Sequence, residues 1–87
     1  MTKTLRNIQK LKQQFPLIWM RPGELFAPGY ANTIWTGEGS EIGDAPAFCS
    51  WGYRDTRGVH PELARALDQM GLYADFYDGG TVFIYQR

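Results

Sequence analysis

The stretch WTGEGSEIGDAPAF, residues 35–48, concentrates acids and glycines that could form a ligand-binding loop. Its glycines have the spacing G-x-G-x-x-x-G, but the acids between them and the lack of a lysine would repel phosphate. Calcium is the better candidate ligand, because Glu38, Glu41 and Asp44 offer oxygen donors at steps of three. That spacing does not match an EF-hand loop, and no bidentate Glu closes the set. We therefore interpret the stretch as a connection between strands whose acidic side chains keep it soluble and whose glycines adopt positive φ.

A second candidate for chemistry is a nucleophile paired with His60, the single histidine of the chain. Cys49 or Ser50 could be that nucleophile, but the base also needs a third group to orient it, and only unspecific acids are available. His60 precedes Pro61 at the expected start of a helix, where a side chain has a local capping task. Cys49 is more typical of a small buried hydrophobe. We expect no catalytic residue, no cofactor and no metal, and a small enzyme is the second alternative function.

The start of the chain is basic, although the whole chain has nine Lys and Arg, nine Asp and Glu, and a formal net charge of zero. Lys3, Arg6, Lys10 and Lys12 could contact phosphates while aromatic rings stack on bases. The nine acids would oppose a polyanion, and no nucleic-acid-binding motif is present. A weak nucleic-acid binder using these four cations is the first alternative function; a solvated helix face is the simpler interpretation.

Aromatic side chains make up 15% of the residues and include three Trp and five Tyr. Trp, Tyr and Arg anchor many protein interfaces, and a core of this size cannot enclose every ring. We therefore predict a non-catalytic protein-binding module that uses an exposed aromatic patch with arginines at its rim. The candidate residues are Tyr30, Trp35, Trp51, Tyr53, Tyr77, Arg54 and Arg57.

Residues 2–15 have the periodicity of an amphipathic helix, with apolar side chains at steps of three and four and cations between them. Thr2 or Thr4 can cap its start, and Pro16 ends it because the residue before a proline avoids helical geometry. The predicted inward stripe is Leu5, Ile8, Leu11 and Phe15.

A second helix is predicted to begin at Pro61, since proline suits the first helical position, and to end before Gly71, which suits a left-handed stop. Glu62 in its first turn favours the helix dipole. Its predicted inward stripe is Leu63, Ala66, Leu67 and Met70.

Short β-rich runs occupy the remaining segments. Four precede the second helix, at residues 17–20, 24–27, 32–35 and 47–53, and two flank Gly79-Gly80 near the end. A two-residue turn at these glycines would pair Phe76 with Phe83 and Tyr77 with Val82. The core face of the hairpin would then be Leu72, Ala74, Phe76, Phe83 and Tyr85.

These elements predict an α+β fold in one domain, residues 1–87, with the order α-β-β-β-β-α-β-β. Its antiparallel sheet would have about four to six short strands, with both helices packed on one face. A lone cysteine, no apolar run of membrane-spanning length and no signal-peptide core predict a protein of the reducing cytoplasm, with no membrane partner.

Three segments, TIWTGEGSEI, GVHPEL and YDGGTVFIYQ, resemble short uncharacterised proteins carried by bacteriophages and other bacterial mobile elements. The resemblance extends over residues 33–86 and contains no motif tied to chemistry. It implies no activity and no site residue. What it implies is a protein that acts by binding a host or phage protein.

Overall fold

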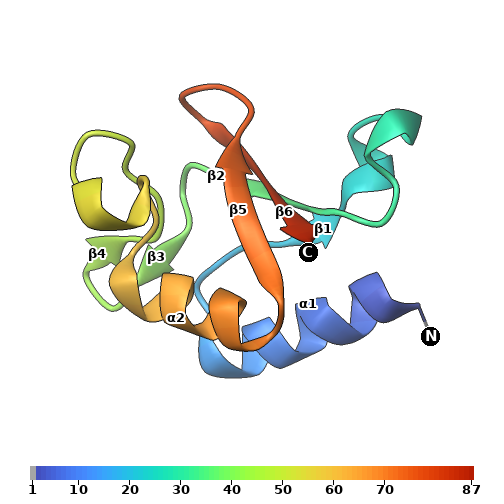
Figure 1. Cartoon of the computed structure of the whole chain (residues 1–87), viewed down its shortest axis with the longest axis horizontal. Coiled ribbons are helices and arrows are strands. Elements are labelled where there is room, and N and C mark those ends of the chain that lie inside the picture. Colours follow the sequence, from blue (N-terminus) through green and yellow to red (C-terminus); the bar gives the residue numbers. More distant parts are fainter. Residues whose placement is uncertain (1) are drawn as a thin grey trace.

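Helix α1, Lys3–Gln14, opens the computed structural model, which describes residues 2–87. Of the two predicted caps, Thr2 is the one used: its hydroxyl accepts a hydrogen bond from the Leu5 N–H at 3.2 Å. At the other end, the Phe15 N–H bonds the Leu11 carbonyl at 2.7 Å before Pro16 stops the helix. The prediction for Leu5 was wrong. The first turn of α1 extends beyond the sheet (Figure 1), which leaves Leu5 41% exposed.

Helix α2, Pro61–Gln69, begins and ends at the predicted signals. His60 is its N-cap, and the Nδ1 atom of His60 accepts a hydrogen bond from the Glu62 N–H at 3.1 Å. Gly71 follows the helix with φ +72°, a left-handed conformation that costs glycine little. The chain can therefore reverse directly into a strand.

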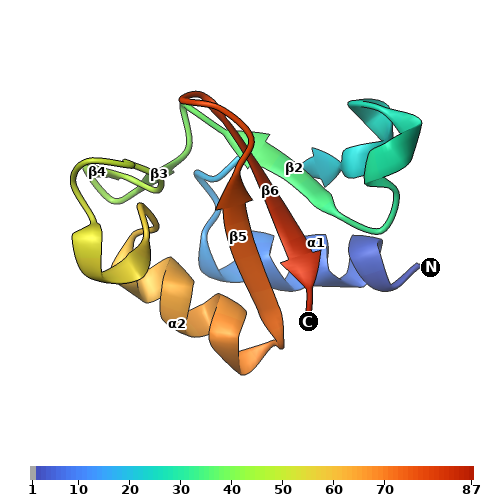
Figure 2. The ribbon, with the colours of Figure 1, turned by 45° about the horizontal axis from the view of Figure 1, so that its top comes forward.

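Four strands form the main sheet, and neighbouring strands are antiparallel throughout. In order across the sheet they are β1 (Arg21–Pro22), β2 (Ile34–Gly37), β6 (Thr81–Gln86) and β5 (Leu72–Phe76). Both helices lie on one face of this sheet (Figures 1 and 2). A separate two-stranded hairpin joins β3 (Glu41–Ile42) to β4 (Ala45–Pro46). The predicted α+β fold and its order of helices and strands are confirmed.

Three of the predicted strands are not strands in the structure. Residues 17–20 form a turn after Pro16. Of residues 24–27, the first two lie in the 3-10 turn η1 (Gly23–Leu25) and the other two connect it to η2 (Pro28–Tyr30). Residues 47–53 turn repeatedly and contribute only an isolated bridge, from Phe48 to Val59. Prolines and glycines that flank or interrupt these segments, Pro16, Gly23, Pro28 and Gly52, favour turns over extended strands. The strand pair β3–β4 instead lies within the acidic stretch, where Gly43 adopts φ +60° at its turn.

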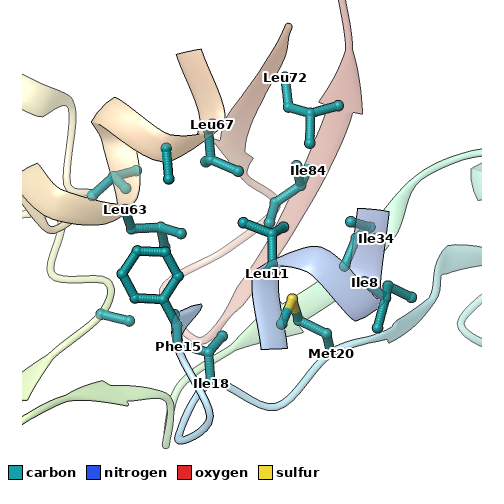
Figure 3. Close-up of a cluster of buried hydrophobic side chains, with 13 residues drawn as sticks. Ile8, Leu11, Phe15, Ile18, Met20, Ile34, Leu63, Leu67, Leu72 and Ile84 are labelled. Carbon is teal, nitrogen blue, oxygen red and sulfur yellow. The ribbon is translucent and has the colours of Figure 1, made fainter. Parts of the chain in front are cut away.

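The hydrophobic core fills the space between the helices and the sheet (Figure 3). Phe15 lies beside Leu63 and so connects the end of α1 with α2. Burying each Leu or Ile side chain contributes about 1.5–3 kcal/mol, which makes this cluster the main source of stability. Its labelled members are Ile8, Leu11, Phe15, Ile18, Met20, Ile34, Leu63, Leu67, Leu72 and Ile84.

The register of the β5–β6 hairpin differs by one residue from the prediction. Phe76 pairs with Val82, and the connection is a four-residue loop closed by the Tyr77 N–H bonding the Thr81 carbonyl at 2.8 Å. The cause is Asp78, whose Oδ1 accepts from the Gly80 N–H at 2.9 Å and shapes the loop without the positive φ of a two-residue turn.

This shift exchanges the two faces of β6, because side chains alternate along a strand. Val82 and Ile84 enter the core below the helices, with 1% of each side chain exposed. The predicted core residues Phe83 and Tyr85 lie on the opposite face, where Phe83 pairs with Asp75 and Tyr85 with Tyr73. The sheet therefore has an aliphatic face under the helices and an aromatic face away from them.

None of the helices within residues 2–87 combines the length and apolar character that crossing a membrane requires. The longer helix, α1, has 12 residues and carries four cations, Lys3, Arg6, Lys10 and Lys12.

Gly37 tests the packing of the sheet against the hairpin loop. A Cβ atom at this position would lie 2.2 Å from the Gly80 carbonyl oxygen, so we expect Gly37→Ala to lower the free energy of unfolding by about 1–3 kcal/mol. Gly79→Ala is the matched control, because a Cβ atom there meets nothing within 4 Å. Thermal unfolding of both variants checks the difference, and equal melting temperatures would contradict this placement of the loop.

Candidate functional site

The face of the sheet opposite the helices carries a row of aromatic side chains. Alternation along the strands directs Trp35 of β2, Phe83 and Tyr85 of β6, and Tyr73 of β5 to this face. The register pairs Trp35 with Phe83 and Tyr73 with Tyr85. The rings of Tyr73 and Tyr85 stack with their centroids 5.3 Å apart. Three strands therefore present one continuous row of rings.

The segment 23–33, which connects β1 to β2, adds two rings above this row. The Tyr30 ring stacks on the Phe83 ring at 4.1 Å with an interplanar angle of 11°. The Phe26 ring meets the rings of Phe83, Trp35 and Tyr77 edge-on at 5.1–5.3 Å. Phe83 is only 1% exposed beneath them. Each such pair contributes about 0.5–1.5 kcal/mol beyond its buried area, which holds the segment against the sheet.

We call this set of connected rings the aromatic layer. One of its ends is fixed by Trp19, whose ring meets Trp35 at 5.6 Å and whose Nε1 donates to the Glu38 carbonyl at 2.8 Å. Its members are Trp19, Phe26, Tyr30, Trp35, Tyr73, Tyr77, Phe83 and Tyr85.

An arginine stacks at each end of the aromatic layer. The Arg21 guanidinium carbon lies 5.6 Å from the Trp19 ring centroid and 5.8 Å from that of Trp35. At the other end, the Arg87 carbon lies 5.9 Å from the Tyr73 ring centroid. These distances allow cation–π attraction of about 0.5–1 kcal/mol at an exposed site.

Three of the predicted protein-binding residues meet in this layer. Tyr77 is 54% exposed and lies edge-on to Tyr30 at 6.1 Å, while Tyr30 and Trp35 are half-buried. Tyr73, which the sequence analysis did not select, is 41% exposed. The rings that reach solvent are therefore concentrated toward β5 and the hairpin loop.

The other four predicted residues lie in the connection between β4 and α2. Trp51 is 82% exposed and borders a cleft of about 300 Å³, and it makes none of the ring contacts found among the residues described. Tyr53 has a local role: its hydroxyl donates to the Pro46 carbonyl at 2.7 Å, and its ring meets His60. Arg54 and Arg57 are exposed in and just after the 3-10 turn η3 (Arg54–Thr56). The predicted patch is thus divided between two regions.

The acids considered for metal binding do not belong to a metal-holding group in the part of the chain described. Glu38, Glu41 and Asp44 are exposed around the β3–β4 hairpin, and residues 2–87 hold no group of three or more His, Cys, Asp or Glu placed for a metal. The predicted positive φ is found at Gly39 and Gly43. The Nδ1 atom of His60 is engaged in capping α2.

Cys49 is half-buried rather than fully enclosed. Its N–H bonds the Gly58 carbonyl at 2.7 Å, and Ser50 beside it is exposed. The hydrogen bond from Cys49 to Gly58 helps to fix the turn between β4 and α2.

The basic residues of α1 point away from the core. Lys3, Arg6, Lys10 and Lys12 are all exposed, on a helix that packs against the aliphatic face of the sheet. The aromatic layer lies on the other face. Phosphate-binding cations and stacking rings therefore do not share one surface here.

Burial raises the pKa of Tyr85 above its ordinary value of 10.0, and Tyr30, Asp75 and Tyr73 raise it further. The folded state thus favours the neutral phenol, so its contribution to stability is complete below pH 10.0 and is lost as pH rises through the folded pKa. We expect the melting temperature of the wild type to fall above about pH 10 and Tyr85→Phe to reduce that fall. Thermal unfolding of both proteins at a series of pH values around 10 measures the difference. The same pH dependence in wild type and Tyr85→Phe would contradict the assignment of the fall to Tyr85.

Comparison with family models, with curated proteins and with solved structures found no match to this chain. No relative therefore supplies a function or a site. The geometry of the aromatic layer and of the surfaces around it is what indicates a function.

Proposed function

We propose that this chain is a non-catalytic protein-binding module and that the aromatic layer is its binding surface. The observation that carries the proposal is the gathering of Tyr, Trp and Phe rings on the sheet face opposite α1 and α2. Interfaces concentrate their binding energy in Trp, Tyr and Arg side chains. Tyr73 and Tyr77 supply exposed rings, and Arg21 and Arg87 supply cations at the two ends.

The rigidity of the layer supports the same proposal. Tyr30 and Phe26 are held against Phe83, so neighbouring Tyr77 contacts a surface that is already ordered. A preorganised surface loses little conformational entropy when a partner binds. We further propose a cytoplasmic protein, with the half-buried free thiol of Cys49 as support, and a bacterial host or phage protein as partner, which the resemblance of residues 33–86 supports.

Tyr77 and Trp51 provide a matched test, because both are exposed rings but only Tyr77 belongs to the aromatic layer. A photo-reactive phenylalanine derivative at position 77 should crosslink a protein in a bacterial lysate. Against that purified protein, we expect Tyr77→Ala to weaken affinity at least tenfold, about 1.4 kcal/mol, measured by calorimetry.

Trp51→Ala is the control and should change that affinity less than twofold. Both variants should keep the circular dichroism spectrum of the wild type, since each removes an exposed ring. Loss of binding with Trp51→Ala alone, or crosslinking to nucleic acid instead of protein, would contradict the proposal.

Nucleic-acid binding is the second candidate, and the observation in its favour is the exposure of four cations along α1. If Lys3, Arg6, Lys10 and Lys12 all contact phosphates, the logarithm of DNA affinity should fall with the logarithm of salt concentration at a slope of about −3 to −4.

Our proposal predicts no such binding. Fluorescence anisotropy with labelled duplex and single-stranded DNA at low salt measures it. A slope in that range, flattened in a Lys10→Glu, Lys12→Glu double variant that stays folded, would favour the nucleic-acid function instead.

A further inference from the structure

The outer edge of β5 is open for pairing. β5 is the last strand of the order β1-β2-β6-β5, and no strand within residues 2–87 pairs with its other side. In an antiparallel pair, residues alternate between directing their backbone groups toward the partner strand and away from it. The direction of each residue in β5 can therefore be worked out from its bonded neighbours.

Two hydrogen bonds fix this alternation. The Tyr77 N–H bonds the Thr81 carbonyl at 2.8 Å, and the Arg87 N–H bonds the Gly71 carbonyl at 2.9 Å. Residues 73 and 75 consequently direct their backbone N–H and C=O groups toward β6. Leu72, Ala74 and Phe76 direct theirs to the open edge.

Part of this edge is already occupied. The Leu72 carbonyl accepts a hydrogen bond from the Arg87 Nε at 3.3 Å. Among the residues described, neither the outward groups of Ala74 nor the N–H of Phe76 has a hydrogen-bond partner. Pairing is thus available over the end of β5 nearer the hairpin loop, and Arg87 closes the other end.

A groove of about 410 Å³ runs beside this edge. β5 forms one side, and α2 with the η3 turn forms the other, on the left of β5 in Figure 2. Apolar side chains from β5 and α2, together with Val59 between η3 and α2, reach it. Its lining consists of Asp55, Thr56, Arg57, Val59, Ala64, Leu67, Tyr73, Ala74 and Arg87.

The two cations that line the groove differ in their pairing. Arg87 is 3.4 Å from the Asp68 carboxylate, whereas Arg57 makes no ion pair with any residue described. Arg57 also adopts φ +53°, a left-handed conformation that a non-glycine residue takes only when its surroundings impose it. The groove therefore presents an exposed cation that makes no ion pair with the residues described, with Asp55 as the nearby acid of the same wall.

We propose that the edge of β5 receives an extended acidic segment of a partner protein as an additional strand. Its backbone pairs with Ala74 and Phe76, alternate apolar side chains enter the groove, and a carboxylate pairs with Arg57. The groove of about 410 Å³ beside the edge leaves space for the side chains of one added strand. The inference rests on the proposed protein-binding function for the class of partner, but it concerns the edge of the sheet, which meets the aromatic layer at Tyr73 and Arg87.

Short peptides test this proposal without knowledge of the natural partner. The probes are a labelled peptide of alternating valine and glutamate, its valine–lysine counterpart, and a valine–glutamate peptide N-methylated at alternate backbone positions. We expect the acidic peptide to bind at least tenfold more tightly than either of the other two in fluorescence anisotropy. Equal affinities, or no binding of the acidic peptide at millimolar concentration, would overturn the proposal.

Variants of the chain assign the contacts. Arg57→Glu should lower the affinity for the acidic peptide at least tenfold and raise the affinity for the lysine peptide. Arg54 is an exposed arginine of the same turn that does not line the groove, so Arg54→Glu should change neither affinity. Ala74→Pro removes an outward N–H, which an edge strand tolerates, and should abolish binding. If that variant is unfolded, the N-methylated peptide decides the backbone pairing. Equal effects of Arg54→Glu and Arg57→Glu would overturn the charge selection.

Two further measurements distinguish this groove from the aromatic layer and from self-association. Tyr77→Ala should leave peptide affinity unchanged, so that failure of the aromatic layer as a binding surface and failure of this groove give different results. Sedimentation of the wild type should show a monomer. A dimer that Ala74→Pro dissociates would mean that a second copy occupies the edge, and would overturn the proposal.

Discussion

The pairing of β6 between β2 and β5 is the constraint on which both faces of the sheet depend. Its alternation sends Val82 and Ile84 beneath the helices and Phe83 into the aromatic layer, and all three are almost completely buried. A shift of one residue would place Phe83 in the aliphatic core and remove the base on which Tyr30 stacks. The helix packing and the candidate binding surface therefore depend on the same register.

That register in turn depends on two local contacts beside the hairpin loop. The side chain of Asp78 bonds the Gly80 N–H, and the Gly80 carbonyl accepts from the Glu38 N–H at 2.9 Å. The second bond brings the end of β2 so close that position 37 has no room for a side chain. A short chain that encloses a modest core benefits from such contacts, because few aliphatic residues are available to fix the register by packing alone.

Sequence patterns predicted the parts of the fold that are determined locally. Helical periodicity, the cap at Thr2 and the start at Pro61 depend on neighbouring residues, and the structure has them as predicted. The turn around Asp78 was missed because Gly79-Gly80 is a strong signal for a shorter turn. This single error moved Phe83 and Tyr85 to the wrong face, which separated them from the predicted patch residues Tyr30, Trp35 and Tyr77. Tyr73 and Asp75, which share one face of β5 between the apolar Leu72, Ala74 and Phe76, were the available signal for an exposed face.

Arg87 connects the two surfaces to which we assign binding. Its guanidinium stacks on Tyr73 of the aromatic layer, bonds the Leu72 carbonyl at the edge of β5, and pairs with Asp68 of α2. If a ligand at one surface requires the Arg87 side chain to move, it must also break the contacts that Arg87 makes at the other surface. Binding at the two surfaces is then coupled by the free energy of those contacts, and such coupling is reciprocal. Because Arg87 and Asp68 are both exposed, the ion pair itself supplies only a small part of that energy.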